Sequence, residues 1–100
     1  MRDVKITVMR ITRYPDLSAI YENPIEHSCD LVPGQSFIAH NGQCPDGFCD
    51  SAWSSMEYFV RELANGRGNF YDGWMKNPDS AMISCNDGFR PVSFLLETVE

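Results

Sequence analysis

The sequence predicts a single α+β domain in which about four mostly antiparallel strands form a small sheet or partial barrel, packed by one main helix and one short helix. Three observations support this fold class. An N-terminal stretch alternates apolar with polar residues, a central stretch repeats apolar residues at helical spacing, and two C-terminal strand candidates flank a turn. The 100 residues suffice for one domain over residues 1–100, and 43% hydrophobic residues with 22% charged residues are typical of a globular protein.

The N-terminal third predicts a strand, a short helix and a second strand. Residues 3–12 alternate in polarity, so one face of this strand is apolar. Pro15 suits the first turn of a helix, and a short helix is expected over about residues 15–22. Residues 35–40 form the second strand candidate, and the Asn-Gly pair that follows favours a turn.

The clearest predicted element is a helix over about residues 50–65. Its apolar side chains recur at steps of three and four, which places them on one face: Trp53, Met56, Val60, Leu63 and Ala64. Asp50 is the predicted N-cap, and Gly66 is expected to end the helix. The apolar face is expected to cover the sheet, so it indicates core packing and no binding function.

The C-terminal third predicts a loop followed by a hairpin. Residues 66–78 are rich in glycine and asparagine, yet the stretch from Phe70 to Met75 is unusually apolar, so this loop is expected to fold over the core or to meet a partner. Residues 81–85 and 91–99 are predicted strands, joined at residues 86–88 by a connection of about three to five residues.

The charge balance excludes some function classes. Eight basic against 14 acidic residues give a net charge of -6, and a nucleic-acid-binding protein needs a basic surplus to neutralise phosphates. The same balance gives no support for binding to an anionic membrane. The first residues contain no unbroken apolar run of the kind that marks a secretory signal. We therefore expect a cytoplasmic protein, whose thiols are kept reduced.

The four cysteines fall at the ends of predicted elements. Cys29 precedes the second strand, and Cys44 lies in the turn region after it. Cys49 immediately precedes the long helix, and Cys85 ends the third strand. A fold gathers side chains from distant sequence at such ends, whereas cysteines that only fill a core more often lie within an element.

Three interpretations of these cysteines stay open. Four thiolates, or three with a histidine, fit a zinc site or an iron–sulfur cluster, although the four-residue spacing between Cys44 and Cys49 is not a zinc signature. Cys49 is alternatively a nucleophile or redox thiol, because a helix start favours a negative charge, while Asp50 beside it opposes one. In the third interpretation, several cysteines are simply buried.

Three other polar residues have ordinary explanations. Asp87, next to Gly88, is accounted for by the turn. Arg90 is expected to be solvated, although it is also suited to holding a carboxylate. His40, at the end of a predicted strand, is expected to be a surface histidine.

Two segments carry a family resemblance. The Gly-Phe-Cys-x-x-Ala-Trp segment at residues 47–53 and the Cys-x-Asp-Gly-x-Arg-Pro-Val segment at residues 85–92 resemble those of a family of small bacterial and archaeal proteins that has no assigned activity. The resemblance spans nearly the whole chain. It implies that Cys29, Cys49 and Cys85 are family positions, whereas Cys44 stands where the family usually has an apolar residue.

The leading expectation is a small cytoplasmic binding module. Cys29, Cys49 and Cys85 form its thiol-rich site for zinc or an iron–sulfur centre, with Cys44 or His27 as the candidate fourth ligand. One alternative is a thiol-dependent enzyme or redox protein with Cys49 as its reactive thiol. Another is an interaction subunit that forms a homo-oligomer, or binds a larger protein, through the loop between residues 70 and 75.

Overall fold

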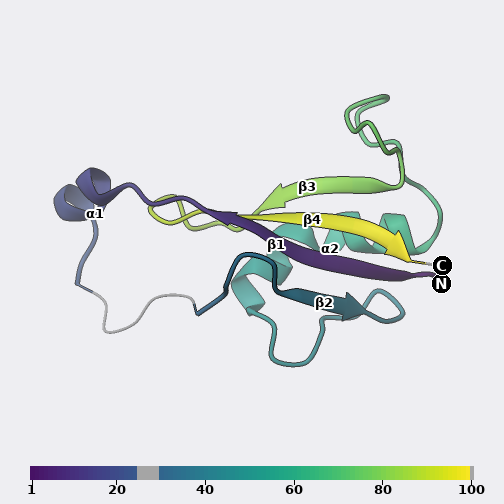
Figure 1. The fold of residues 1–100 in the computed structure, drawn as a ribbon, viewed down its shortest axis with the longest axis horizontal. Coiled ribbons are helices and arrows are strands. Elements are labelled where there is room, and N and C mark those ends of the chain that lie inside the picture. The colour runs from purple at the N-terminus through teal and green to yellow at the C-terminus, as the bar shows by residue number, and fades with distance from the viewer. Residues whose placement is uncertain (25–29, 100) are drawn as a thin grey trace.

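Four strands form one open antiparallel sheet in the order β2-β1-β4-β3 in the computed structural model, which describes residues 1–24 and 30–99 (Figure 1). The elements in chain order are β1 (Asp3–Ile11), α1 (Pro15–Tyr21), β2 (Ser36–Ala39), α2 (Asp50–Ala64), β3 (Ser80–Ser84) and β4 (Val92–Val99). The predicted α+β class is confirmed, and the sheet is open, with β2 and β3 as its edges.

The core lies between the sheet and α2, which packs against β1, β3 and β4. Alternation places every second residue of the central strands on this face, including Ile6 of β1 and Phe94 of β4, and both are fully buried. The buried residues of α2 are Ala52, Met56, Val60, Leu63 and Ala64. Each large side chain in this layer contributes about 1.5–3 kcal/mol through burial. The predicted helix face is thus confirmed as core, except that Trp53 is only half-buried.

β1 carries the chain beyond the sheet to α1. Its register with β4 shifts between Val8 and Arg10, so the strand contains a bulge near Met9. After the strand, the Thr12 amide donates to the Pro91 carbonyl at 3.0 Å, and the Tyr14 amide donates to the Phe89 carbonyl at 2.9 Å. These bonds hold α1 beside the β3–β4 connection, and α1 itself buries no residue (Figure 1).

The β3–β4 connection is longer than predicted. It runs over residues 85–91, because the Asp87 carboxylate organises the backbone there in place of a tight turn. Asp87 Oδ1 accepts hydrogen bonds from the amides of Phe89 and Arg90, at 2.8 and 3.2 Å. The Cys85 amide donates to the Val92 carbonyl at 3.0 Å and closes the connection.

The sequence predicted the C-terminal end of α2 but not its N-terminal cap. The expected Asp50 N-cap is wrong, because the helix begins at Asp50 and the capping position belongs to Cys49, whose backbone is extended. Gly66 follows the helix with a φ of 74°, a left-handed conformation that glycine adopts without strain, so the predicted stop is confirmed. The loop after it buries Phe70 and exposes Tyr71 and Trp74.

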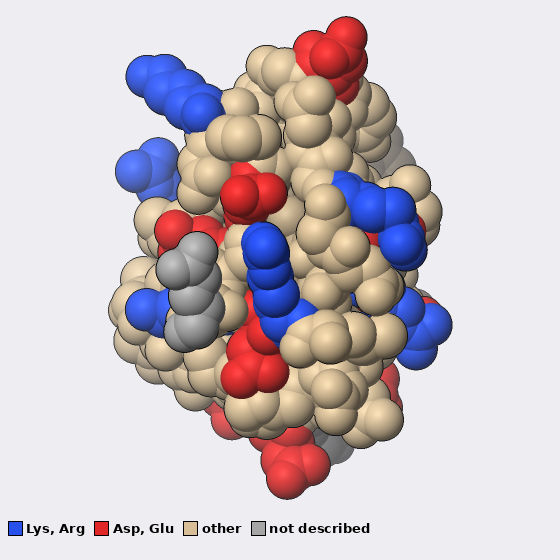
Figure 2. Space-filling view, turned by 90° about the vertical axis from the view of Figure 1, so that its right-hand side faces the viewer, with Lys and Arg blue, Asp and Glu red and all other residues tan. Residues whose placement is uncertain are grey.

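Charges of both signs lie interspersed at the end of the sheet where both termini emerge (Figure 2). Basic and acidic side chains alternate over this face, and no single-sign patch extends across it. Neither helix among the described residues has the length and the apolar run needed to span a membrane.

Gly68 lies too close to another part of the backbone to accept a side chain. A Cβ there would collide with the Pro78 carbonyl oxygen, whereas a Cβ on Gly88 would have no heavy atom within 4 Å. We therefore expect Gly68→Ala to lower the free energy of unfolding by about 1–3 kcal/mol. The matched Gly88→Ala variant should stay within about 0.5 kcal/mol of the parent protein in urea denaturation. Equal stability of the two variants would contradict the close approach of Gly68 to the Pro78 carbonyl.

Candidate functional site

A cavity of about 180 Å³ lies where the start of α2 meets the β3–β4 connection. Two cysteines from distant parts of the sequence, Cys49 and Cys85, line it, and we call it the Cys49–Cys85 pocket. Its other lining residues combine polar side chains with apolar ones: Ser51, Asp87, Arg90, Leu31, Ala52, Val92 and Phe94. The pocket thus presents two thiols beside both a carboxylate and a guanidinium.

Cys49 is held at the pocket by the residue before it. Phe48 is buried, and its ring contacts Phe37 of β2 and Phe94 of β4 edge to face, with centroids 4.9 and 5.6 Å away. This anchoring fixes where α2 begins. Cys49 itself is exposed, and its side chain makes no capping hydrogen bond to the helix. The thiol is therefore open to a ligand or a reagent.

Cys85 is more tightly held than Cys49. It directly follows β3 and is half-buried. Its sulfur accepts a hydrogen bond from the Val92 amide at 3.3 Å, while its own amide donates to the Val92 carbonyl. The backbone of β4 therefore fixes the position of the Cys85 sulfur.

An ion pair joins the pocket to α1. Arg90 donates from both terminal nitrogens to the two carboxylate oxygens of Glu22, at 2.9 and 2.7 Å, and the two side chains are 17% and 19% exposed. Asp87 lies 3.8 Å from the same guanidinium. The hydrogen bond from Arg90 lowers the pKa of Glu22, and the same contact raises the pKa of Arg90. Arg90 is therefore a paired and half-buried residue, and the expectation that it is solvated is wrong.

Cys44 does not line the Cys49–Cys85 pocket. It is half-buried and lines a separate hollow that includes His40 and Asp46. Burial raises the pKa of the Cys44 thiol, and the neighbouring Asp50 raises it further. His40 is exposed as predicted, with its Nδ1 3.0 Å from Asp3 Oδ2.

The described residues do not form a metal site by themselves. Within residues 1–24 and 30–99, no group of three or more His, Cys, Asp and Glu side chains is arranged to hold a metal ion. Of the predicted ligands, Cys49 and Cys85 share one pocket. Cys29 and His27 lie outside the described residues.

Sequence reasoning missed the roles of Arg90, Asp87 and Glu22 at this site. Arg90 and Asp87 stand in the same short segment as Cys85, and that proximity was the available signal. Glu22 is 68 residues from Arg90, and nothing in the local sequence indicates the pairing.

The Glu22–Arg90 pair makes stability depend on pH. Because the pKa of Glu22 in the folded protein is below its ordinary value of 4.5, the stabilisation is complete above that value and is lost as the pH falls through the folded pKa. We expect Glu22→Gln to lower the urea midpoint at pH 7, and the difference from the parent protein to shrink as the pH falls below 4.5 and through the folded pKa of Glu22. Asp16→Asn removes a carboxylate charge from the first turn of α1, whereas Glu22 is the C-cap residue of that helix, and this variant serves as control. A difference that stays constant with pH would contradict the pairing.

No family model, no curated protein and no solved structure matches this chain. The family resemblance of residues 47–53 and 85–92 therefore stays a prediction. Functional conclusions depend on the geometry of the Cys49–Cys85 pocket.

Proposed function

We propose that the protein is a small binding module whose site is the Cys49–Cys85 pocket, and that its ligand is a thiophilic metal centre, zinc or iron–sulfur. The observation that carries the proposal is the meeting of two cysteines, from the start of α2 and the end of β3, at one cavity. Thiolates are the ligands that zinc and iron–sulfur clusters share.

Cys29 supplies the third thiolate of the proposal. Leu31 lines the pocket, and Cys29 precedes it by two residues, a chain length that spans at most about 7 Å. Because the described side chains contain no group of three ligands, the proposal makes Cys29 essential. Of the two predicted candidates for the fourth position, the proposal keeps His27, because Cys44 lines a separate hollow. Each cysteine releases its proton to solvent when its sulfur binds the metal.

Zinc binding tests this proposal directly. We expect reduced, metal-free protein to take up one zinc ion and, with free zinc at about 100 times the Kd, to gain about 2.7 kcal/mol of stability, which raises the Tm by roughly 10–20 °C. A chromophoric chelator in competition measures the affinity. Cys29→Ser, Cys49→Ser and Cys85→Ser should each weaken binding by at least about 10-fold, the loss typical of even an outer-shell contact.

Cys44→Ser is the matched control for zinc binding through the pocket, because Cys44 lines a different hollow. We expect Cys44→Ser to bind zinc as tightly as the parent protein does. That result would show that Cys44 is not a ligand of the site. Iron and sulfide in anaerobically purified protein would identify a cluster in place of zinc. A Tm that changes neither with added zinc nor with added chelator would contradict the metal proposal.

A reactive thiol at Cys49 is the second candidate function. Two observations favour it: Cys49 is exposed while Cys44 and Cys85 are half-buried, and no hydrogen bond to the helix start engages the Cys49 side chain. Thiol chemistry needs an accessible sulfur, and Cys49 offers one beside a cavity that can hold a substrate. Cys85, in the same pocket, is the candidate resolving thiol.

Alkylation rates separate the two candidates. With iodoacetamide at pH 8, Cys49 should be modified first and Cys44 last among Cys44, Cys49 and Cys85, because the raised pKa of Cys44 leaves less of that thiol as reactive thiolate. Peptide mass spectrometry at timed intervals gives the order in which the cysteines are modified. The same measurement on urea-unfolded protein gives the reference rate of each cysteine in the absence of folded structure. Added zinc should protect Cys49 and Cys85 and leave Cys44 unchanged if the pocket binds metal. Faster modification of Cys44 than of Cys49 would contradict the reactive-thiol candidate.

A further inference from the structure

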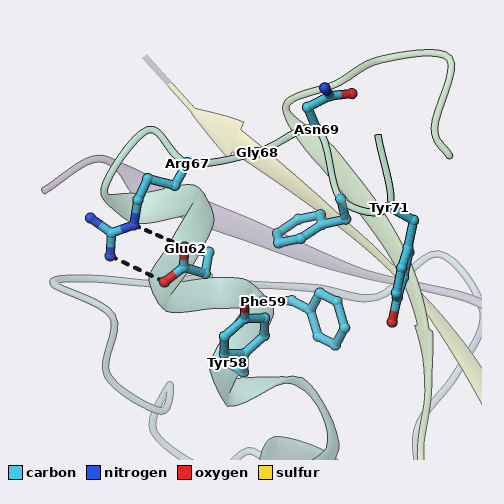
Figure 3. Close-up of a pocket in the computed structure, with 8 residues that line it drawn as sticks. Tyr58, Phe59, Glu62, Arg67, Gly68, Asn69 and Tyr71 are labelled. Carbon is cyan, nitrogen blue, oxygen red and sulfur yellow. Dashed lines mark hydrogen bonds and ion pairs between the residues drawn. The ribbon is translucent and has the colours of Figure 1, made fainter. Parts of the chain in front are cut away.

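A second hollow, of about 410 Å³, lies between the C-terminal half of α2 and the loop that follows it (Figure 3). It shares no lining residue with the Cys49–Cys85 pocket. Four aromatic residues line it, Tyr58 and Phe59 from α2 and Phe70 and Tyr71 from the loop, and we call it the aromatic pocket. In Figure 3 the ring of Tyr71 stands across the hollow from those of Tyr58 and Phe59.

The aromatic rings form a supported wall. Phe70 is buried and contacts Phe59 edge to face, with centroids 4.9 Å apart, and Phe59 contacts Tyr58 in the same way at 5.3 Å. Trp74 supports Tyr71 from outside the hollow, with centroids 5.4 Å apart. Tyr58 and Tyr71 nevertheless remain 65% and 76% exposed. The core therefore holds one side of the pocket, while its two tyrosines face solvent.

The loop backbone holds Tyr71 in place. Tyr71 and the adjacent Asp72 have φ angles of 55° and 51°, a left-handed conformation that residues other than glycine rarely adopt. Asn69 secures this turn, because its side-chain oxygen accepts from the Gly73 amide at 3.0 Å and its backbone amide donates to the Pro78 carbonyl at 2.7 Å. Such disfavoured conformations concentrate at ligand-binding sites.

The charges around the hollow favour a cationic ligand. Arg67 donates two hydrogen bonds to Glu62, at 2.8 and 3.1 Å, so the one basic side chain that lines the hollow is neutralised by its partner. Asp72, which follows Tyr71 in the chain, is exposed and lies outside the lining of the hollow, with a carboxylate oxygen 3.4 Å from the Asn69 side-chain amide. The whole chain carries a net charge of -6. The faces of aromatic rings are themselves electron-rich and attract cations.

We propose that the aromatic pocket binds an alkylated ammonium group, carried either by a free small molecule or by a lysine side chain of a partner protein. An anion would meet an acidic protein and the negative faces of the rings. A neutral apolar ligand would gain burial alone, without the attraction of the rings. This site adds to the proposed function of the Cys49–Cys85 pocket and does not depend on it.

Choline and its uncharged isostere, in which a tert-butyl group replaces trimethylammonium, test the proposal. The two ligands have nearly the same shape, so a difference in affinity reports the charge. We expect choline to bind about two- to thirtyfold more tightly than the isostere, the range that cation–π attraction gives from exposed to desolvated sites. Titration of the full chain, followed by intrinsic fluorescence and by NMR, measures the affinities of both ligands.

Paired variants separate aromatic attraction from apolar contact. Tyr58→Leu and Tyr71→Leu should remove the preference for choline over the isostere, whereas Tyr58→Phe and Tyr71→Phe should retain most of it. Both tyrosines are largely exposed, so the variants should fold, and circular dichroism verifies this. Tyr21→Leu, which removes another exposed tyrosine on α1, is the control and should bind choline as the parent protein does.

Peptides that differ only at one position, trimethyllysine, lysine or norleucine, distinguish the two sources of the cation. Binding of the trimethyllysine peptide at least tenfold tighter than choline indicates a protein partner, and equal affinities indicate a small molecule. Either result supports the site. Equal binding of choline and its isostere, leucine variants that keep the preference, or no saturable binding of any of these cations would overturn the proposal.

Discussion

The packing of α2 against the central strands is the contact on which both pockets depend. Met56, Val60 and Leu63 are buried on the helix face that meets β1, β3 and β4, and this layer fixes the helix axis relative to the sheet. The Cys49–Cys85 pocket forms at the first turn of the helix and the aromatic pocket along its last turns. A shift of α2 by one turn, about 5.4 Å, would separate the residues that line both.

The elements of the fold were largely predictable because each follows from local periodicity. Alternation in residues 3–12 and the three-to-four repeat of the long helix each depend on neighbouring residues alone. Capping at Cys49 was missed because Asp50 has the better intrinsic preference, and the buried Phe48 overrides that preference by fixing where the helix starts. The length of the β3–β4 connection depends on Asp87, whose hydrogen bonds no periodicity reveals.

The candidate site was predictable only in part, because its geometry depends on contacts between distant segments. The positions of Cys49 and Cys85 at element ends pointed to one region of the fold, and both residues line the same pocket, whereas the three-cysteine site stays a prediction. The half-buried pair of Glu22 and Arg90 depends instead on residues 12–14, which follow β1 and bond to the β3–β4 connection, and the sequence of α1 contains no sign of this pairing. The apolar loop that forms one side of the aromatic pocket stood out in the sequence. The other side, Tyr58 and Phe59, did not, because these residues lie in a helix whose periodicity indicated only core packing.

α1 is attached to the domain by fewer contacts than hold the sheet together, so the two parts differ in local stability. The helix buries no side chain. Within residues 1–24 and 30–99, it is attached by backbone bonds before Pro15 and by the contacts of Arg90 with Glu22 and Ser18. Detachment of such a segment exposes little apolar surface, so it needs far less free energy than opening of the sheet. We therefore expect amide hydrogens in α1 to exchange with solvent through local opening, and those of β1 and β4 to exchange only through global unfolding. Because Arg90 lines the Cys49–Cys85 pocket, each such opening would free its guanidinium from Glu22, while Asp87 still holds its backbone amide and the core stays folded.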